Sequence, residues 1–290
     1  MAQAPVLALD IGGSKVAAAL VVGGQVLELE QMPTPAIDGP EAVVVAARIV
    51  AGRLLARAPR APSALGVACA GLVSGGTVRA LSADLLPGWH AYPLAARLQE
   101  AFSLPAALIN DAQAAAYGEA AYGAGRGKGS LLFVTVSTGV GGGLVLGGKP
   151  WRGANGMAGH LGQVGGRALE RVTSGTALAV RASELGHPVG AREVIAAAQA
   201  GEAWARVLLT DAAEALAAAL VDAKYLLDPE VVVLGGGVGL NPGFELALRS
   251  AFEGVEATLS TPVLRAELGA AAGLVGAAAW ALSCETSTPP

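Results

Sequence analysis

A short polar segment near the N-terminus holds the first residues that could do chemistry, and they are Asp10, Gly12, Gly13, Ser14 and Lys15. Glycines at a strand-to-strand turn let backbone N–H groups close on a phosphate, and a serine hydroxyl and a lysine ammonium add donors. An aspartate at the end of the first strand could hold a hydrated Mg²⁺ through water, because this ion prefers oxygen ligands and keeps its waters. The alternative is a tight hairpin with an incidental aspartate, so the segment alone is weak evidence for a phosphate site.

Two later glycine turns follow the same design. Residues 137–143 place Thr138 and Gly139 between two apolar runs, although a close-packed hairpin would need the same glycines. A third turn follows another apolar run and could pass under a flat base or ribose; it consists of Gly235, Gly236 and Gly237. Three glycine turns at strand ends predict a polyphosphate nucleotide bound between two halves of the chain. The pattern is neither a Walker P-loop, since no GxxxxGK[ST] occurs, nor a dinucleotide fold, since no strand–GxGxxG–helix unit occurs.

The pair Asn110-Asp111 comes directly after the apolar run 106–109. Side chains at the carboxyl ends of strands enter the crevice of an open α/β sheet. An aspartate there could accept a proton from a substrate hydroxyl while orienting that hydroxyl for in-line attack on a γ-phosphate. The alternative is that Asp111 acts near the N-cap of the alanine-rich helix expected through Tyr122, and from these residues alone the cap is the simpler interpretation.

Two more polar residues lie in or beside the segment 147–173, which is expected to be a loop. His160 lies among glycines, which favours a binding loop over a histidine packed in the core. Glu170 precedes a Thr-Ser-Gly sequence and could hydrogen-bond a polyol or lie in the first turn of a helix.

Alternating strands and helices must position these residues. Apolar runs predict strands at 6–9, 16–22, 25–30, 65–69 and 106–109, and composition predicts helices at 41–58 and 93–101. Residues 132–146 repeat the strand–turn–strand layout of residues 6–22 after about 125 residues, which indicates two similar α/β halves. We expect one lobe from residues 1–112 with a C-terminal helix in 271–290, and a second lobe from 113–270. No Pro/Ser-rich linker divides them, so the boundary is expected to be a hinge within one body.

Composition excludes several classes of protein. Of the 290 residues, 53% are hydrophobic and 14% charged, which excludes a disordered chain. The net charge is −4 and no basic block occurs, so nucleic acid is not an expected partner. The uncharged stretch 129–148 has the length of a membrane span, but its glycines and central hydroxyls predict two buried strands around a turn. The N-terminus lacks a basic signal-peptide region, and two distant cysteines are typical of a reduced compartment. We expect no membrane association and a cytoplasmic location.

Several motifs of the chain resemble those of the ROK family (repressor, open reading frame, kinase) of sugar kinases, within the actin-like ATPase superfamily. The resemblance spans nearly the whole chain, and its most specific pieces are INDAQAAAYGE at 109–119, FVTVSTGVGGGLV at 133–145 and GMAGHLGQ at 156–163. It implies an α/β fold of two RNase H-like lobes with ATP and sugar in the cleft between them. No helix-turn-helix segment precedes Asp10, which is similar to the kinase members and unlike the repressors.

The resemblance also implies a role for each matching residue. Asp111 corresponds to the catalytic base that accepts the hydroxyl proton, and Asp10 lies near Mg²⁺, through water. Sugar contacts are implied at Gly71, Asn110, Asp111, His160 and Glu170. ATP contacts are implied at Asp10, Gly12, Gly13, Ser14, Lys15, Thr138, Gly139, Gly235, Gly236 and Gly237.

Two departures from the family pattern affect what is expected. The family's structural zinc site uses a histidine and a cysteine-rich run, whereas this chain has Gln163 and the short segment 164–168, with Cys69 and Cys284 elsewhere. No zinc is therefore expected. In the sugar loop SADLLPGW, Leu85 stands where many members have an asparagine, which leaves the sugar open.

The expected reaction is phosphorylation of a sugar hydroxyl by Mg-ATP. His160 replaces a glutamate of many family glucokinases and is similar to bacterial N-acetylmannosamine kinases. An imidazole can both donate and accept, so it tolerates an acetamido neighbour. N-acetylmannosamine is the preferred substrate, with glucose as the alternative. If the protein is not an enzyme, the alternative is a catalytically silent member of the family that binds sugar. A homodimer is implied by the resemblance.

Overall fold

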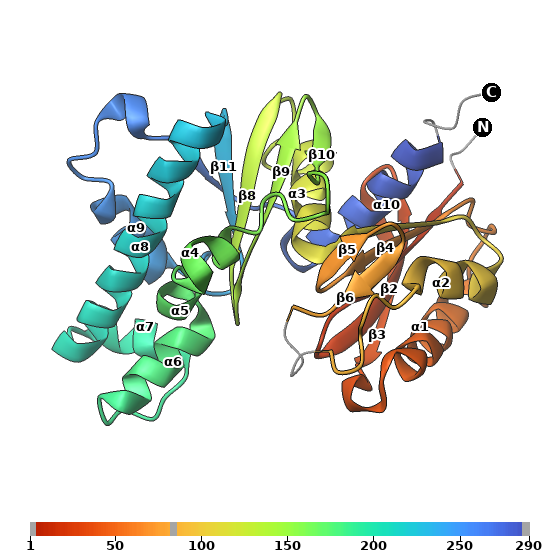
Figure 1. The fold of residues 1–290 in the computed structure, drawn as a ribbon, viewed down its shortest axis with the longest axis horizontal. Coiled ribbons are helices and arrows are strands. Elements are labelled where there is room, and N and C mark those ends of the chain that lie inside the picture. The colour runs from red at the N-terminus through yellow and green to blue at the C-terminus, as the bar shows by residue number, and fades with distance from the viewer. Residues whose placement is uncertain (1–3, 82–85, 286–290) are drawn as a thin grey trace.

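The computed structural model describes residues 4–81 and 86–285, which form two α/β lobes side by side (Figure 1). Each lobe is built on a five-stranded sheet. Helix α3 (Asp111–Tyr122) and helix α10 (Ala272–Glu285) lie where the chain passes between the lobes. The two-lobed α/β architecture confirms the fold predicted from the sequence. The boundary near residue 112 remains a proposal.

The sheet of the first lobe has antiparallel strands on one side and parallel strands on the other. In spatial order it consists of β3 (Gln25–Pro33), β2 (Lys15–Val22), β1 (Val6–Ile11), β4 (Leu65–Cys69) and β7 (Ala106–Asn110). Strands β1, β4 and β7 are parallel, and β1–β2 and β2–β3 are antiparallel. The apolar central strands are buried because helices cover both of their faces.

Alternation along β1 determines which side chains meet which helix. Leu7, Leu9 and Ile11 pack on the face covered by α1 (Pro40–Leu55) and α2 (Leu94–Phe102). Val6 and Ala8 point to the opposite face, where they meet α10. Because side chains alternate along a strand, Asp10 belongs to the α10 face, at the end of β1.

The sheet of the second lobe repeats this topology. In spatial order it consists of β10 (Lys149–Trp151), β9 (Val140–Leu146), β8 (Ser130–Val136), β11 (Val231–Gly235) and β12 (Val263–Arg265). The first two pairings are antiparallel and the last two parallel. Its main helices are α6 (Gly175–Glu184), α7 (Ala191–Ala200), α8 (Ala203–Leu227) and α9 (Pro242–Ala251). Among the described residues no helix has both the length and the apolar composition of a membrane span.

Several short elements escaped the sequence analysis. They are the hairpin β5 (Leu72–Ser74) and β6 (Thr77–Arg79), strand β10, helices α4 (Val164–Arg167) and α5 (Glu170–Thr173), and the 3-10 turns η1 (Ala36–Asp38), η2 (Leu161–Gln163), η3 (Ala257–Leu259) and η4 (Gly269–Ala271). Each covers only three or four residues, which is too short for hydrophobic periodicity to reveal. Residues 147–173, expected to be a plain loop, therefore contain a strand and three short helical turns.

The two helices at the lobe junction pack with their backbones almost in contact. A Cβ atom on Gly276 of α10 would lie 1.7 Å from the Ala114 carbonyl oxygen of α3, and one on Gly118 would lie 2.6 Å from the Ala272 carbonyl oxygen. Such distances exclude any side chain at either position, so the glycines are required for the two helices to meet.

The Glu119 carboxylate of α3 hydrogen-bonds to both chain segments that connect the two lobes. Its carboxylate is fully buried and accepts hydrogen bonds from the backbone N–H groups of Ala124 (2.9 Å), Glu267 (3.1 Å) and Leu268 (2.8 Å). Ala124 lies on the way from α3 to β8, and the other two lie on the way from β12 back to α10. One carboxylate therefore anchors the chain where it leaves the first lobe and where it returns.

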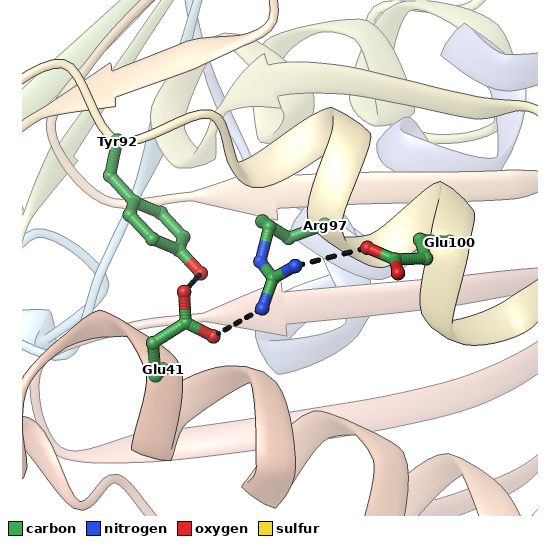
Figure 2. A network of polar contacts seen from close by, with 4 residues as sticks. All are labelled: Glu41, Tyr92, Arg97 and Glu100. Carbon is green, nitrogen blue, oxygen red and sulfur yellow. Dashed lines mark hydrogen bonds and ion pairs between the residues drawn. The ribbon is translucent and has the colours of Figure 1, made fainter.

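A surface network joins the two outer helices of the first lobe (Figure 2). The Tyr92 hydroxyl donates to Glu41 of α1 at 2.8 Å, and the Arg97 guanidinium of α2 donates to Glu41 at 2.9 Å and to Glu100 at 3.0 Å. The groups are exposed, so each ion pair stabilises the fold only slightly. Their effect is to hold α2 against α1, away from the cleft.

Candidate active site

A cleft of about 1240 Å³ separates the two sheets and is lined from both lobes. The residues predicted from the sequence that line it are Asp10, Gly12, Gly13, Gly71, Asn110, Asp111, Thr138, Gly139, His160, Glu170, Gly235, Gly236 and Gly237. Ser14 and Lys15 were predicted with them, but their side chains are exposed and are not part of the cleft wall. Segments that lie far apart in the sequence therefore converge on one cavity.

Asp111 begins helix α3 at the carboxyl end of β7. The helix cap is Asn110 rather than Asp111: its side-chain oxygen accepts hydrogen bonds from the N–H groups of Ala112 (3.0 Å) and Gln113 (3.1 Å). The Asn110 amide nitrogen donates to Oδ1 of Asp111 at 2.8 Å and to the Gly71 carbonyl at 3.0 Å. The cap therefore orients the neighbouring carboxylate, and the simpler interpretation drawn from the sequence is corrected.

Hydrogen bonds reach the Asp111 carboxylate at Oδ1, one of its two oxygens. Oδ1 accepts hydrogen bonds from the N–H group of Ala112 at 2.8 Å and from Asn110, and the residue lines the cleft. Burial raises the pKa of Asp111 above its usual value, whereas these hydrogen bonds and the nearby His160 oppose the rise. A carboxylate whose pKa is raised is a stronger proton acceptor once ionised.

Asp10 faces the same cleft from the end of β1. Burial raises the pKa of its carboxyl to about 6, the negative charge of Asp111 adds to the rise, and Lys15 opposes it. A Cβ atom on Gly273, in the first turn of α10, would lie 3.4 Å from the Asp10 carboxylate, so the start of that helix approaches the acid closely. Two carboxylates of like charge thus share one partly buried site.

This pair fits a divalent cation that keeps its water ligands. The described residues contain no group of three His, Cys, Asp or Glu side chains that could enclose a metal directly. Mg²⁺ is usually held by one or two carboxylates, with water and substrate phosphates completing its shell. A cation beside Asp10 would also offset the mutual repulsion that raises the Asp10 pKa.

The glycine turns present backbone to the cleft. Gly236 has a left-handed φ of +88°, and a Cβ atom there would lie 2.2 Å from the Val136 carbonyl oxygen, so no other residue fits. The first turn is closed by a hydrogen bond from the Gly12 N–H to the Lys15 carbonyl at 3.0 Å. Thr34 braces this turn by donating its hydroxyl to the Gly12 carbonyl at 2.7 Å.

Glu170 lies against the second glycine turn. Its carboxylate accepts a hydrogen bond from the Val140 N–H at 3.1 Å, and a Cβ atom on Gly139 would lie 3.0 Å from the same oxygen. The residue is in the first turn of α5, as one of the two interpretations drawn from the sequence has it. It also lines the cleft, and its hydrogen bond to a polyol stays a prediction. Arg171 also lines the cleft, and the sequence analysis did not single it out.

One ring nitrogen of His160 has no partner among the described residues. Nδ1 lies 3.1 Å from the Met157 carbonyl oxygen, and in the neutral imidazole this arrangement makes Nδ1–H the donor and leaves Nε2 as an acceptor. Nε2 is buried and has no hydrogen-bond partner among the described residues. Leu85 of the predicted sugar loop lies outside the described residues, and Trp89 of that loop is completely buried.

Comparison with known proteins agrees with this geometry. The model of the ROK family matches residues 6–283. The chain is 45% identical over 282 residues to the bifunctional enzyme NanE/NanK of Brucella melitensis, covering 95% of this chain but 54% of that protein. It therefore spans about half the length of that relative. It is 38% identical over 289 residues to the N-acetylmannosamine kinase of Yersinia pseudotuberculosis, covering 95% of this chain and 97% of that one.

A solved structure shares the architecture. A ROK family glucokinase from Streptomyces griseus, crystallised with glucose and AMPPNP, superimposes with a TM-score of 0.82 at 28% identity, covering 96% of this chain and 99% of that one. The family match, the relatives and this shared fold extend over nearly all of the described residues, and the chain belongs to the ROK family.

Proposed function

We propose that the protein is an ATP-dependent sugar kinase that converts N-acetylmannosamine to its 6-phosphate. The observation that carries this proposal is the Asp111 carboxylate, oriented by Asn110 and the start of α3, in the same cleft as three glycine turns. A sugar hydroxyl needs an acceptor for its proton, and a polyphosphate needs backbone donors and a cation. One cavity holds side chains and glycine turns suited to both requirements, which supports the proposal.

In the proposed reaction Asp111 accepts the proton of the attacking hydroxyl and aligns its oxygen with the γ-phosphate. Asn110 holds this carboxylate in place through its amide and is tied to Gly71 on the neighbouring loop. Backbone N–H groups of the glycine turns bind the phosphates, and Asp10 would hold a hydrated Mg²⁺ through one of its waters. Mg²⁺, when present with the nucleotide, supplies charge neutralisation on the phosphate oxygens. Catalysis then depends on positioning and electrostatics.

The choice of sugar depends on His160. The residue lines the cleft, and in the neutral ring its Nε2 is an acceptor without a partner among the described residues, which suits a hydroxyl donor beside an acetamido group. The relatives named N-acetylmannosamine kinase and NanE/NanK support the same sugar. Glucose is the second candidate because the Streptomyces griseus glucokinase shares the fold.

A coupled ADP-release assay with both sugars tests this assignment. We expect kcat/KM for N-acetylmannosamine to exceed that for glucose by about 10-fold or more, which corresponds to about 1.4 kcal/mol of transition-state discrimination. His160→Glu should lower the ratio of the two kcat/KM values, because it restores an acceptor suited to paired hydroxyls. Turnover of glucose alone would establish the glucokinase alternative. Sugar binding without ADP release would identify a catalytically silent member of the family.

Location and assembly follow from the same proposal. An enzyme that consumes ATP is expected in the cytoplasm, where ATP and reduced thiols are available, and Cys69 and Cys284 are both free. We also expect a homodimer by resemblance to the family, and sedimentation measurements would test it. Nucleic acid and membranes are not expected partners.

A further inference from the structure

Gln113 is a buried polar residue that the reaction described above does not use. It lies two residues after Asp111 on α3 and is 1% exposed. Its amide nitrogen donates to the Gly156 carbonyl at 3.1 Å and to the Ala158 carbonyl at 2.9 Å. The amide oxygen is buried without a partner among the described residues, so the two bonds donated by the nitrogen are what fixes the side chain against its acceptors.

Both acceptors belong to the segment 152–160, here called the His160 loop, which joins β10 to η2 and contains no helix or strand. Gln113 thus bonds from outside the loop to two of its carbonyls. From within the loop, the Arg152 guanidinium donates to the Val73 carbonyl at 3.1 Å, and Gly159 packs closely against Gly143 of β9. Gln113 therefore anchors the part of the loop that precedes His160, whereas Arg152 anchors its start.

The anchored carbonyls flank the group that orients His160. Gly156 and Ala158 are the neighbours of Met157, whose carbonyl accepts the hydrogen bond from Nδ1 of His160. Fixing the peptides on both sides of Met157 fixes its carbonyl, and that carbonyl determines the tautomer and direction of the imidazole. The contacts lead in sequence from Gln113 through the loop backbone to the imidazole of His160, a residue that lines the cleft.

We propose that Gln113 is a positioning residue for sugar recognition and that it acts through His160. The inference rests on the proposed function, in which His160 contacts the sugar. Because Asp111 and Gln113 share the first turn of α3, one rigid helix end would set both the proton acceptor and the imidazole. The chemistry requires an amide of this length: glutamate cannot donate to two carbonyls, and methionine has similar length but no donor.

The test compares Gln113→Met in two backgrounds. In the wild-type background we expect the KM for N-acetylmannosamine to rise about 10-fold, with the KM for ATP unchanged, because small misplacements of a contact weaken binding strongly. In the His160→Ala background the same substitution should raise the sugar KM no further. The matched control, Gln99→Met, makes the same change at an exposed position of α2 and should leave both constants unchanged. Equal rises in both backgrounds, or no rise in either, would overturn the proposal.

A spectroscopic measurement separates this proposal from the proposed function. The chain contains three histidines, so their imidazole ¹⁵N signals can be assigned by substitution. We expect His160 to show the Nδ1–H tautomer in the wild type and to lose that single state in Gln113→Met. An unchanged His160 signal in the variant would refute the positioning role even if no sugar were phosphorylated. A wild type that releases no ADP with any sugar would instead refute the proposed function.

Discussion

The buried carboxylate of Asp10 leads to a prediction about stability and pH. The pKa of Asp10 is about 6 in the folded protein against 3.8 in the reference state. The folded protein thus binds this proton more tightly than the unfolded chain, and the stability gained from that binding is lost as the pH rises from 3.8 through 6. Asp10→Asn removes the titration. Without Mg²⁺ or nucleotide, the variant should be more stable than the wild type by about 3 kcal/mol at pH 7.5.

The assay is urea denaturation of both proteins across a pH series. The advantage of the variant should shrink to about 1 kcal/mol at pH 4.5, because the folded carboxyl is then almost fully protonated and only the interval between 3.8 and 4.5 contributes. Asp222→Asn, an exposed substitution on α8, controls for loss of one negative charge. If the free energies of unfolding of Asp10→Asn and the wild type differed by the same amount at every pH, the reasoning would be refuted, whatever that amount is.

Three further predictions concern packing and metal content. Glu119→Ala leaves three backbone N–H groups without their acceptor and should cost about 3–5 kcal/mol in urea denaturation; an unchanged midpoint would contradict the anchoring role. Gly276→Ala should destabilise the folded protein by about 2 kcal/mol or more, because its Cβ would meet the Ala114 carbonyl. Gly52→Ala, in open space on α1, should instead stabilise it by about 0.5–1 kcal/mol. Equal changes in the free energy of unfolding for the two variants would refute the packing argument. Elemental analysis should find no stoichiometric zinc, and chelators should leave Tm unchanged; tightly bound zinc would contradict the reading of residues 160–168.

The sequence predicted the features that depend on local patterns. Strand β4, Leu65–Cys69, coincides with its predicted range, and β7 differs from its own by one residue. Apolar runs with glycine turns at their ends are local signals, and the topology of two parallel strands brings Asp10 and Asp111 to the same edge of the sheet. The location of the three glycine turns at the ends of apolar runs predicted that they lie around one site between the two halves, and all three line the cleft.

What the sequence could not predict depends on contacts between distant residues. The bonds from Gln113 to the His160 loop span more than forty positions, and no local pattern reports them. Glu170 meets Val140 thirty positions away for the same reason. Ser14 and Lys15 were assigned to the phosphate site because of their types, yet β2 begins at Lys15 and both side chains lie exposed. The choice of Asn110 over Asp111 as the cap depends on side-chain rotamers that the residue types leave open.

The most direct test of the central claim is the rate of sugar-dependent ADP release by Asp111→Asn. Asparagine keeps the shape of the side chain but cannot accept the hydroxyl proton, so kcat with N-acetylmannosamine should fall by about 10²-fold or more. Nucleotide binding should stay close to that of the wild type, and Tm should not fall, since the cap is made by Asn110 and the substitution removes a carboxyl whose pKa burial raises. A variant that released ADP at nearly the wild-type rate would contradict the assignment of Asp111 as the proton acceptor, and with it the mechanism proposed for this cleft.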